Sequence, residues 1–318
     1  MLKLEPQNQI QITENNISEI LKTYEIFKFT FVLINKGIEN TSVLITAGEV
    51  KYVLRIYKQS KKKEDDVLFE INFQDYLRDH GVPIPIIFKN IEKKEVSVVA
   101  VGGKTWNCIM MAFVEGQSSA VIATDELIRS LAKLQAKMHL LGVGYAESLK
   151  RPRKLWKDLH DSLAENIKDI PGNEKTVYEF LERAKSFRYN LNPNLPYGYN
   201  HMDIDLDGNL IVNNNKIMAI IDFDDLRYSP IIACLGFTLW NVLDDQGMDA
   251  MYAYLKEYEK IRLISPLEYE ALPSVLLFRN YIIGIIRIAT RDSSTSMPNL
   301  ENIFKLEQEI PNLFAKNY

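Results

Sequence analysis

Cysteine is scarce in this chain of 318 residues, which contains only Cys108 and Cys234. Two cysteines so far apart have no metal-binding spacing and cannot form the disulfide framework of a small secreted domain. The four histidines (His80, His139, His160 and His201) also lack ligand spacing, so no zinc site is predicted. These absences favour a protein of the reducing cytoplasm.

Long apolar runs are missing as well. The longest stretches, at 231–243 and 282–288, are too short or too interrupted by charge to span a bilayer. The chain starts Met-Leu-Lys-Leu-Glu-Pro, without a basic segment followed by an apolar one, so no signal peptide is predicted. We therefore expect a soluble protein with no membrane partner.

The chain has no strong excess of either charge. Its 38 Lys and Arg residues against 42 Asp and Glu residues give a formal net charge of -4, so nucleic acid is not a predicted partner. A hydrophobic content of 47% is ordinary for a globular protein, and the length suffices for one large domain or two lobes. The composition says nothing about oligomeric state.

Residues 27–114 are dominated by β-branched and aromatic runs separated by turn residues. These runs predict strands at 29–34, 42–47, 51–57, 96–101 and 105–114, with one helix at 63–81. Gly102-Gly103 fits a two-residue hairpin turn. It is not the end of a phosphate-binding P-loop, because Val98 occupies the position of that motif's first glycine. This part of the chain predicts a small antiparallel sheet.

Helical periodicity replaces the strand pattern after Gly116. Thr124 is a candidate N-cap, followed by acids and then by apolar residues at helical spacing. Ser265-Pro-Leu-Glu268 is a capping box with proline at the first helical position. Residues 151–196 predict two helices joined at 171–173. We expect a boundary near 115–119, which divides the chain into residues 1–116 and 117–318.

Acids and amides are concentrated in residues 201–225, where the surrounding sequence predicts strands. Asp222 ends an apolar run and is followed by Asp224 and Asp225. Asp203 and Asn209 lie in the loop before the preceding strand. Carboxylates and an amide that converge on one turn are suitable ligands for a hard cation such as Mg²⁺.

A cation also interrupts an apolar strand near the N-terminus. Arg55 needs a partner if its side chain points inward, and Glu70 on the following helix is the nearest candidate. Such a pair would hold a positive charge over an anionic ligand, whereas the alternative is an exposed arginine on an edge strand. The loop at 35–41, which contains Gly37, either covers phosphates with backbone N–H groups or is a plain hairpin connection.

Taken in order, these motifs resemble the aminoglycoside phosphotransferase and choline kinase-like family. The residues that carry the resemblance are Arg55 in its strand, Glu70, the His201-Met-Asp203 loop, Asn209-Leu-Ile-Val and Ile221-Asp222-Phe. The resemblance implies an α+β, protein-kinase-like fold with a small sheet lobe, a larger helical lobe and ATP between them. The implied reaction transfers the γ-phosphoryl group to a small-molecule alcohol, so catalysis is positioning and charge neutralisation.

The resemblance also assigns roles to residues of this chain. Asp203 would accept or orient the proton of the substrate hydroxyl, and Asp222 with Asn209 would hold Mg²⁺. Arg55 would contact the α- and β-phosphates and would be fixed by Glu70.

Further positions match the parts of this family that bind the nucleotide. The Gly37 loop corresponds to the phosphate loop. Backbone groups from Met111 to Val114, Phe113 included, would face the base of ATP or GTP. The family's substrates are hydroxylated amines, amino acids, sugars and aminoglycoside-type antibiotics, and the sequence does not choose among them.

Two departures from the family pattern affect the proposed site. The metal-binding Asn usually follows the catalytic Asp by five residues, whereas Gly208 stands there and Asn209 comes one residue later. Either Gly208 absorbs the extra residue through unusual backbone angles, or Asp205 or Asp207 takes over a role. Cys234 stands where relatives often carry an acid that braces the catalytic loop, so bracing must come from elsewhere or the loop is looser.

Three functional hypotheses follow from the sequence. The first is an active small-molecule kinase. The second is a degenerate kinase fold that binds a nucleotide or a partner without turnover, which the two departures motivate. The third is a Ser/Thr protein kinase on the same scaffold, which is disfavoured because no activation segment follows Asp222.

Overall fold

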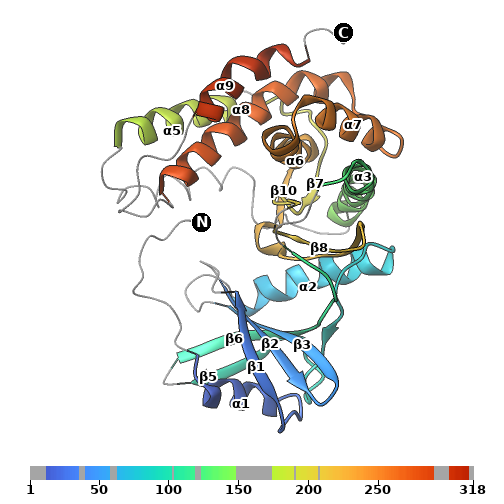
Figure 1. Cartoon of the computed structure of the whole chain (residues 1–318), viewed down its shortest axis with the longest axis vertical. Coiled ribbons are helices and arrows are strands. Elements are labelled where there is room, and N and C mark those ends of the chain that lie inside the picture. The colour runs from blue at the N-terminus through green and yellow to red at the C-terminus, as the bar shows by residue number, and fades with distance from the viewer. Residues whose placement is uncertain are drawn as a thin grey trace. The chain divides into compact units, whose positions relative to one another are not determined.

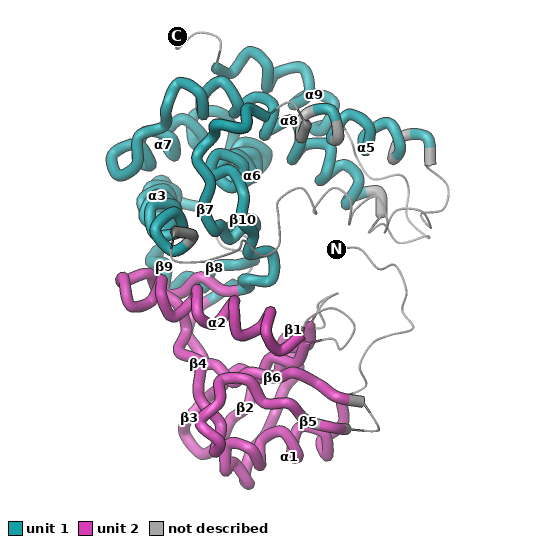
Figure 2. The backbone as a smooth tube through the Cα atoms, turned by 180° about the vertical axis from the view of Figure 1, so that it is seen from behind, with its two compact units in different colours: residues 1–4, 117–217, 222–318 teal, residues 5–116, 218–221 magenta. Residues whose placement is uncertain are grey.

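The computed structural model describes residues 12–35, 40–57, 63–101, 104–118, 123–147, 174–189, 191–206, 208–289 and 301–314. The chain divides into two compact units (Figures 1 and 2). Unit 2 holds residues 5–116 together with the short segment 218–221, and unit 1 holds residues 117–217 and 222–318. The main division therefore falls between Gly116 and Gln117.

Unit 2 contains the antiparallel sheet that the sequence predicts. Its strands are β1 (Thr30–Asn35), β2 (Asn40–Ala47), β3 (Val50–Tyr57), β4 (Ile87–Phe88), β5 (Ser97–Val101) and β6 (Lys104–Ala112). They follow the order β1-β2-β3-β6-β4, and β5 also pairs with β6. Val101 pairs with Lys104, so only two residues connect β5 to β6, as a tight hairpin requires. Those two glycines lie outside the described residues.

A helix packs on each face of this sheet (Figure 1). Alternate residues of β6 face opposite ways: Cys108 and Met110 pack with α1 (Glu14–Lys22), and Ile109 packs with α2 (Glu64–Asp79). The sequence predicted α2 but not α1. The N-terminus of α1 is closed by a capping box in which Thr13 and Asn16 exchange hydrogen bonds of 3.0 and 3.3 Å.

Unit 1 is mainly helical. Its helices are α3 (Asp125–Glu147), α5 (Glu174–Tyr189), α6 (Ile231–Gln246), α7 (Met248–Glu259), α8 (Pro266–Ala289) and α9 (Glu301–Glu309), with short 3₁₀ helices η2 (Phe223–Asp225) and η3 (Ile310–Asn312). Strand β7 (Tyr197–Asn200) pairs with β10 (Arg227–Pro230), and β8 (Leu210–Asn213) pairs with β9 (Lys216–Ile220). Every residue of α6 from Ile231 to Leu243 is buried, which makes α6 the central helix of this unit.

The structure confirms both predicted helix starts in unit 1. The Leu127 N–H donates to Thr124 Oγ1 at 3.2 Å before α3. At α8, Ser265 and Glu268 form the predicted capping box, with hydrogen bonds of 3.0 and 3.3 Å between backbone and side chain. Of the two helices expected between 151 and 196, the second is α5, and the first falls outside the described residues.

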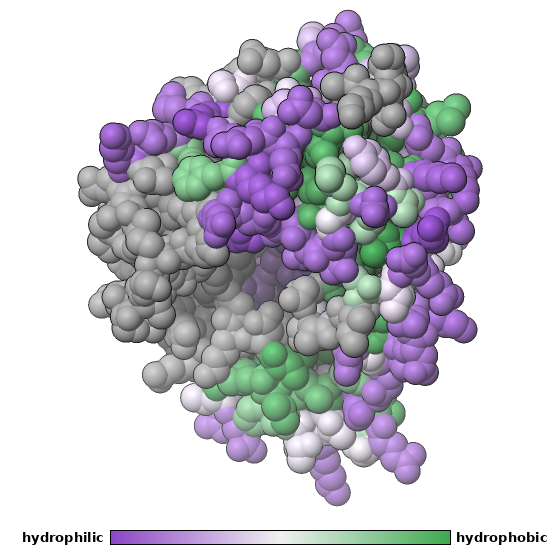
Figure 3. All heavy atoms as spheres, turned by 45° about the horizontal axis from the view of Figure 1, so that its top comes forward, coloured by the Kyte–Doolittle hydropathy of each residue, from purple (hydrophilic) through white to green (hydrophobic). Residues whose placement is uncertain are grey.

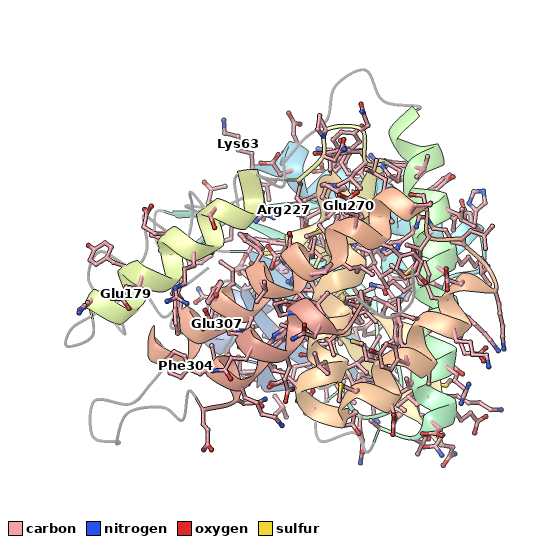
Figure 4. All side chains as sticks on the ribbon, turned by 90° about the horizontal axis from the view of Figure 1, so that it is seen from above. Lys63, Glu179, Arg227, Glu270, Phe304 and Glu307 are labelled. Atoms are coloured by element: carbon pink, nitrogen blue, oxygen red, sulfur yellow. The ribbon has the colours of Figure 1, made fainter. Side chains whose placement is uncertain are left out.

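Helix α9 is held against α5 and α8 (Figure 4). The Glu307 carboxylate accepts hydrogen bonds from Arg183 of α5 and, at 2.6 Å, from the Tyr281 hydroxyl of α8. The Phe180 and Phe304 rings lie 5.9 Å apart. Hydrophilic side chains cover much of the described surface shown in Figure 3, with groups of hydrophobic residues between them. Among the described helices, none is both long and apolar enough to cross a membrane.

A close backbone contact joins α3 to β7. A Cβ atom added at Gly142 of α3 would lie 2.1 Å from the Tyr199 carbonyl oxygen, and one at Gly198 would lie 3.0 Å from backbone atoms of Gly142 and Val143. Only glycine fits positions where two backbones approach this closely. This contact fixes the strand that leads directly into the His201-Met-Asp203 loop.

The buried His139 makes stability depend on pH. Its Nδ1 lies 2.6 Å from the Tyr258 hydroxyl, and burial, helped by the nearby Arg262, lowers its pKa well below the ordinary value of 6.5. The unfolded chain takes up a proton at this residue below pH 6.5, whereas the folded chain does not. Stability is therefore retained above about pH 6.5 and falls by about 1.4 kcal/mol per unit below it.

Urea unfolding between pH 5 and 8 checks this expectation. His139→Gln should remove that part of the pH slope, whereas His80→Gln, at an exposed position, should keep it. An unchanged slope in His139→Gln would assign the effect to other groups.

Candidate active site

The His201-Met-Asp203 loop begins where β7 ends and is held by the neighbouring strand. The Asn200 side chain donates hydrogen bonds to the Ser229 carbonyl and hydroxyl oxygens at 3.2 and 2.9 Å. Met202, between His201 and Asp203, has a φ of 67°. A residue other than glycine rarely adopts this backbone conformation, so surrounding contacts must hold it in place. Such strain is common at functional sites.

A contact between two rings links this loop to the Asp222 turn. The His201 ring, only 1% exposed, lies 4.5 Å from the Phe223 ring at an interplanar angle of 60°. Asp222 itself is left-handed, with φ 65° and ψ 66°, and precedes η2. The chain thus presents two strained residues, Met202 and Asp222, on segments that touch through His201 and Phe223.

The structure brings Asp203 and Asn209 together. The Asn209 side-chain nitrogen donates to the Asp203 carbonyl oxygen at 2.7 Å and to its Oδ2 at 3.1 Å. A third residue, Arg279 of α8, donates to Asp203 Oδ1 at 3.2 Å. Both carboxylate oxygens of Asp203 therefore have a partner. The sequence predicted the first two residues and missed Arg279.

The surroundings of Asp203 act on its pKa in opposite directions. Burial raises the pKa of the Asp203 carboxyl, while the positive charge of Arg279 opposes this and the negative charge of Asp225 adds to it. The net direction is upward. Since 38% of the side chain remains exposed, the carboxylate is reachable as well as partly desolvated. A raised pKa suits a group that must accept a proton.

Gly208 does not accommodate the extra loop residue in the way the sequence suggested. Its φ lies outside the left-handed region, and a Cβ atom added there would meet no atom within 4 Å. Among the described residues from 203 to 209, none has a left-handed φ, whereas Met202, just before them, does. The loop keeps Asn209 on Asp203 despite the longer spacing. Asp205 is described, and Asp207 lies outside the described residues.

Cys234 takes part in bracing the loop although it is not an acid. The Met202 N–H interacts with the Cys234 thiol, and burial, the largest influence, raises the thiol pKa to about 12, so the thiol is neutral. Gln135 Nε2 donates to Thr238 Oγ1 at 2.8 Å, and Thr238 Oγ1 lies 3.5 Å from the Ile204 carbonyl oxygen. The bracing that the sequence left unassigned thus comes from neutral groups on α3 and α6.

Unit 2 carries the predicted phosphate-binding residues. Arg55 lies on β3, pairs with Ile109 of β6 in register, and has its guanidinium 5.6 Å from the centre of the Tyr57 ring. Glu70 of α2 is only 2% exposed. A carboxylate buried to this extent needs a cation or hydrogen-bond donors beside it. The Arg55–Glu70 pair stays a prediction.

The predicted nucleotide-base segment follows the last strand of the sheet. Met111 pairs with Val53 of β3, and β6 ends at Ala112, so Phe113 and Val114 continue beyond the ladder. Lys51 lies over the Phe113 ring at 5.0 Å. Gly37, from the predicted phosphate loop, falls outside the described residues.

The residues predicted to hold a metal supply suitable donors. Asp222 offers carboxylate oxygens and Asn209 an amide oxygen, and hard cations prefer both. Within the described residues, no group of three or more His, Cys, Asp and Glu side chains is placed to hold a metal. Two protein ligands are enough for Mg²⁺, which usually completes its coordination with water and substrate phosphates.

The fold and the Asp203 loop together define a kinase-like phosphotransferase. A family model described as the phosphotransferase enzyme family matches residues 30–272, and the chain belongs to that family. It is a small-molecule kinase, which uses ATP to phosphorylate a hydroxyl group. The family and its relatives support the first of the three functional hypotheses.

Relatives by sequence include homoserine kinases. The homoserine kinase of Caulobacter vibrioides is 28% identical over 278 residues, covering 82% of this chain and 82% of that enzyme. The homoserine kinase of Bartonella henselae is 28% identical over 284 residues, covering 84% and 83%.

Solved structures share the fold at lower identity. An amicoumacin kinase in complex with AMP-PNP and Ca²⁺ matches with a TM-score of 0.75 at 18% identity, covering 95% of this chain and 94% of that one. A microcompartment-associated aminopropanol kinase matches with a TM-score of 0.71 at 18% identity, covering 95% and 96%. These similarities confirm the protein-kinase-like fold.

Proposed function

We propose that this protein transfers the γ-phosphoryl group of ATP to the hydroxyl of a small hydroxy amino acid such as homoserine, with Mg²⁺ as its metal. The observation that carries the proposal is the Asp203 carboxylate, held at once by Asn209 and by the cation Arg279. The homoserine kinases that match over most of this chain support the substrate class. We expect the protein to act in the cytoplasm.

Asp203 acts on the substrate hydroxyl. Its carboxylate accepts a hydrogen bond from the hydroxyl, aims the oxygen at the γ-phosphorus and takes the proton as the new P–O bond forms and the bond from the γ-phosphorus to the β,γ-bridging oxygen breaks, which releases ADP. Asn209 holds the Asp203 carbonyl and Oδ2, which leaves the oxygen of its own amide for a cation. The strained Met202 and its contacts fix the direction of this carboxylate.

Asp222 and Asn209 are the residues that would hold Mg²⁺, which when bound supplies charge neutralisation at the phosphates. Arg55 adds a fixed positive charge for the α- and β-phosphates, and the buried Glu70 fixes its guanidinium. Backbone groups of Met111, Phe113 and Val114 bind the adenine. The Gly37 loop is assigned to the phosphates by family resemblance alone.

A turnover assay across a panel of alcohols tests the substrate class. Purified protein with Mg²⁺ and ATP should phosphorylate L-homoserine with a higher kcat/KM than choline, 3-aminopropan-1-ol, glucose or kanamycin. Replacing ATP by GTP in the same assay tests the nucleotide. A preference for kanamycin or choline over homoserine would contradict the proposed substrate class while leaving the kinase activity intact.

Asp222→Asn should weaken the binding of Mg²⁺ without destabilising the fold. Removing one negative charge from the pair of metal ligands is expected to raise the Mg²⁺ concentration for half-maximal activity by about tenfold or more. Titration of activity against Mg²⁺ at fixed ATP measures this shift. Asp249→Asn, at an exposed position of α7, is the control and should titrate like the wild type. Identical curves for Asp222→Asn and the control would remove Asp222 from the metal site.

A further inference from the structure

Arg279 is a buried cation whose hydrogen-bonding capacity is poorly used. Its side chain is 11% exposed and lies 4.9 Å from the centre of the Phe237 ring. The guanidinium contacts Asp203 Oδ1 at 3.2 Å and Asn241 Oδ1 at 3.5 Å, both at or beyond the long end of the hydrogen-bond range. Among the described residues, its Nε and the side-chain nitrogen of Asn241 have no partner.

Arg262 and Arg287 of unit 1 are paired more tightly than Arg279, whereas Arg129 and Arg227 contact carboxylates at 3.1 Å. Arg262 donates to Glu268 at 2.6 Å, and Arg287, on the same helix as Arg279, donates to Asp244 at 2.6 Å. Those pairs have the short distances of charge-assisted hydrogen bonds. Arg279 has only the longer contacts to Asp203 and Asn241, which indicates a cation that is not tightly committed to Asp203 as a structural partner.

Asp203, the partner of Arg279, is also the residue that must accept the hydrogen bond from the substrate hydroxyl. An aspartate that keeps a guanidinium on one oxygen has less capacity for a new hydrogen bond than one that has released it. A substrate carboxylate can bind a guanidinium through two parallel hydrogen bonds, a better arrangement than the single contact to Asp203.

We propose that Arg279 recognises the carboxylate of the substrate and passes from Asp203 to that carboxylate when the substrate binds. The inference rests on the proposed function and names the group that selects the substrate. A short hydroxy acid places its hydroxyl at Asp203 and its carboxylate at Arg279, two neighbouring positions in the structure. A substrate without a carboxylate leaves Arg279 on Asp203. Recognition of the carboxylate and release of Asp203 are then the same event.

The test compares two substrates that differ only in this group. 3-Aminopropan-1-ol is homoserine without its carboxylate. In the full-length protein, Arg279→Met should lower kcat/KM for L-homoserine by about 100-fold, the value of a lost charged hydrogen-bond pair. The kcat/KM for 3-aminopropan-1-ol should fall by a clearly smaller factor, which reflects only the lost contact of Arg279 with Asp203, so the ratio of the two kcat/KM values should drop. Arg279→Lys, which keeps the charge without the fork, should show an intermediate loss for homoserine.

Arg287→Met is the matched control, because it removes another arginine of α8 and should leave the ratio of the two kcat/KM values unchanged. Melting temperatures of all variants verify that they are folded. If Arg279→Met and Arg279→Lys each lower kcat/KM by the same factor for both substrates, the proposal is overturned, since Arg279 would then only position Asp203.

Calorimetry separates this proposal from the proposed function. Binding of L-homoserine to the wild type and its loss in Arg279→Met support the carboxylate site even if homoserine is not turned over, in which case the proposed function fails alone. If the wild type phosphorylates homoserine and Arg279→Met loses kcat/KM equally for homoserine and 3-aminopropan-1-ol, the proposed function is supported and the proposed carboxylate site is wrong. Absence of Arg279-dependent binding for homoserine and for 4-hydroxybutyrate overturns the carboxylate site.

Discussion

Asp203→Asn is expected to lower kcat by about 10²–10⁴-fold, with a much smaller change in KM. The amide has nearly the same shape as the carboxylate and can still accept a hydrogen bond, but it cannot take a proton. The Asn209 contact to the Asp203 carbonyl, at 2.7 Å, does not involve the altered group, so the loop should keep its conformation. Steady-state kinetics at saturating Mg²⁺ and ATP measure the effect.

The companion variants Asp205→Asn and Asp207→Asn test whether, in the longer loop, Asp205 or Asp207 has taken over the role assigned to Asp203. Each should retain most of the wild-type kcat, because Asn209 contacts Asp203 in spite of the extra residue. If Asp205→Asn or Asp207→Asn abolishes turnover and Asp203→Asn does not, the proton-accepting role has moved along the loop and our assignment is wrong.

Gly142→Ala should cost several kcal/mol of folding free energy, about 3–5 kcal/mol. The new Cβ atom would lie 2.1 Å from the Tyr199 carbonyl oxygen. That oxygen belongs to the backbone of a buried strand, so no flexible side chain can move aside. Helix α3 and strand β7 must separate, and the loop that begins at His201 must follow. Urea unfolding and the melting temperature measure the loss.

The control for this prediction is Gly208→Ala. No atom lies within 4 Å of the added Cβ there, and the backbone is not left-handed, so the change in stability should stay below about 1 kcal/mol. Equal stabilities for Gly142→Ala and Gly208→Ala would mean that α3 and β7 are not held in contact in solution.

Local patterns in the sequence were sufficient for much of the fold. The strands of unit 2 except the two-residue β4 followed from β-branched and aromatic runs, and the starts of α3 and α8 followed from Thr124 and the Ser265–Glu268 box. Helix α1 was missed because its capping box uses Asn16 in place of the usual Glu or Gln.

The candidate site was predictable only where its residues form a linear motif. Asp203 and Asn209 are six residues apart, and the structure joins them. Arg279 is 76 residues from Asp203, and Gln135 is 103 residues from Thr238. No periodicity or spacing indicates such contacts, because packing of α3, α6 and α8 creates them. The close backbone contact between Gly142 and Gly198 likewise joins segments that are distant in the sequence.

The discontinuity of unit 2 has a consequence for synthesis on the ribosome. Residues 5–116 leave the ribosome long before residues 218–221, which complete the unit and whose Ile220 N–H donates to the Pro83 carbonyl at 2.8 Å. The strands of the N-terminal sheet all lie within residues 30–112 and can pair before then, but the Ile220–Pro83 hydrogen bond can form only after the catalytic loop has been translated. The last contacts of unit 2 are therefore made by a segment that is translated after about a hundred residues of unit 1.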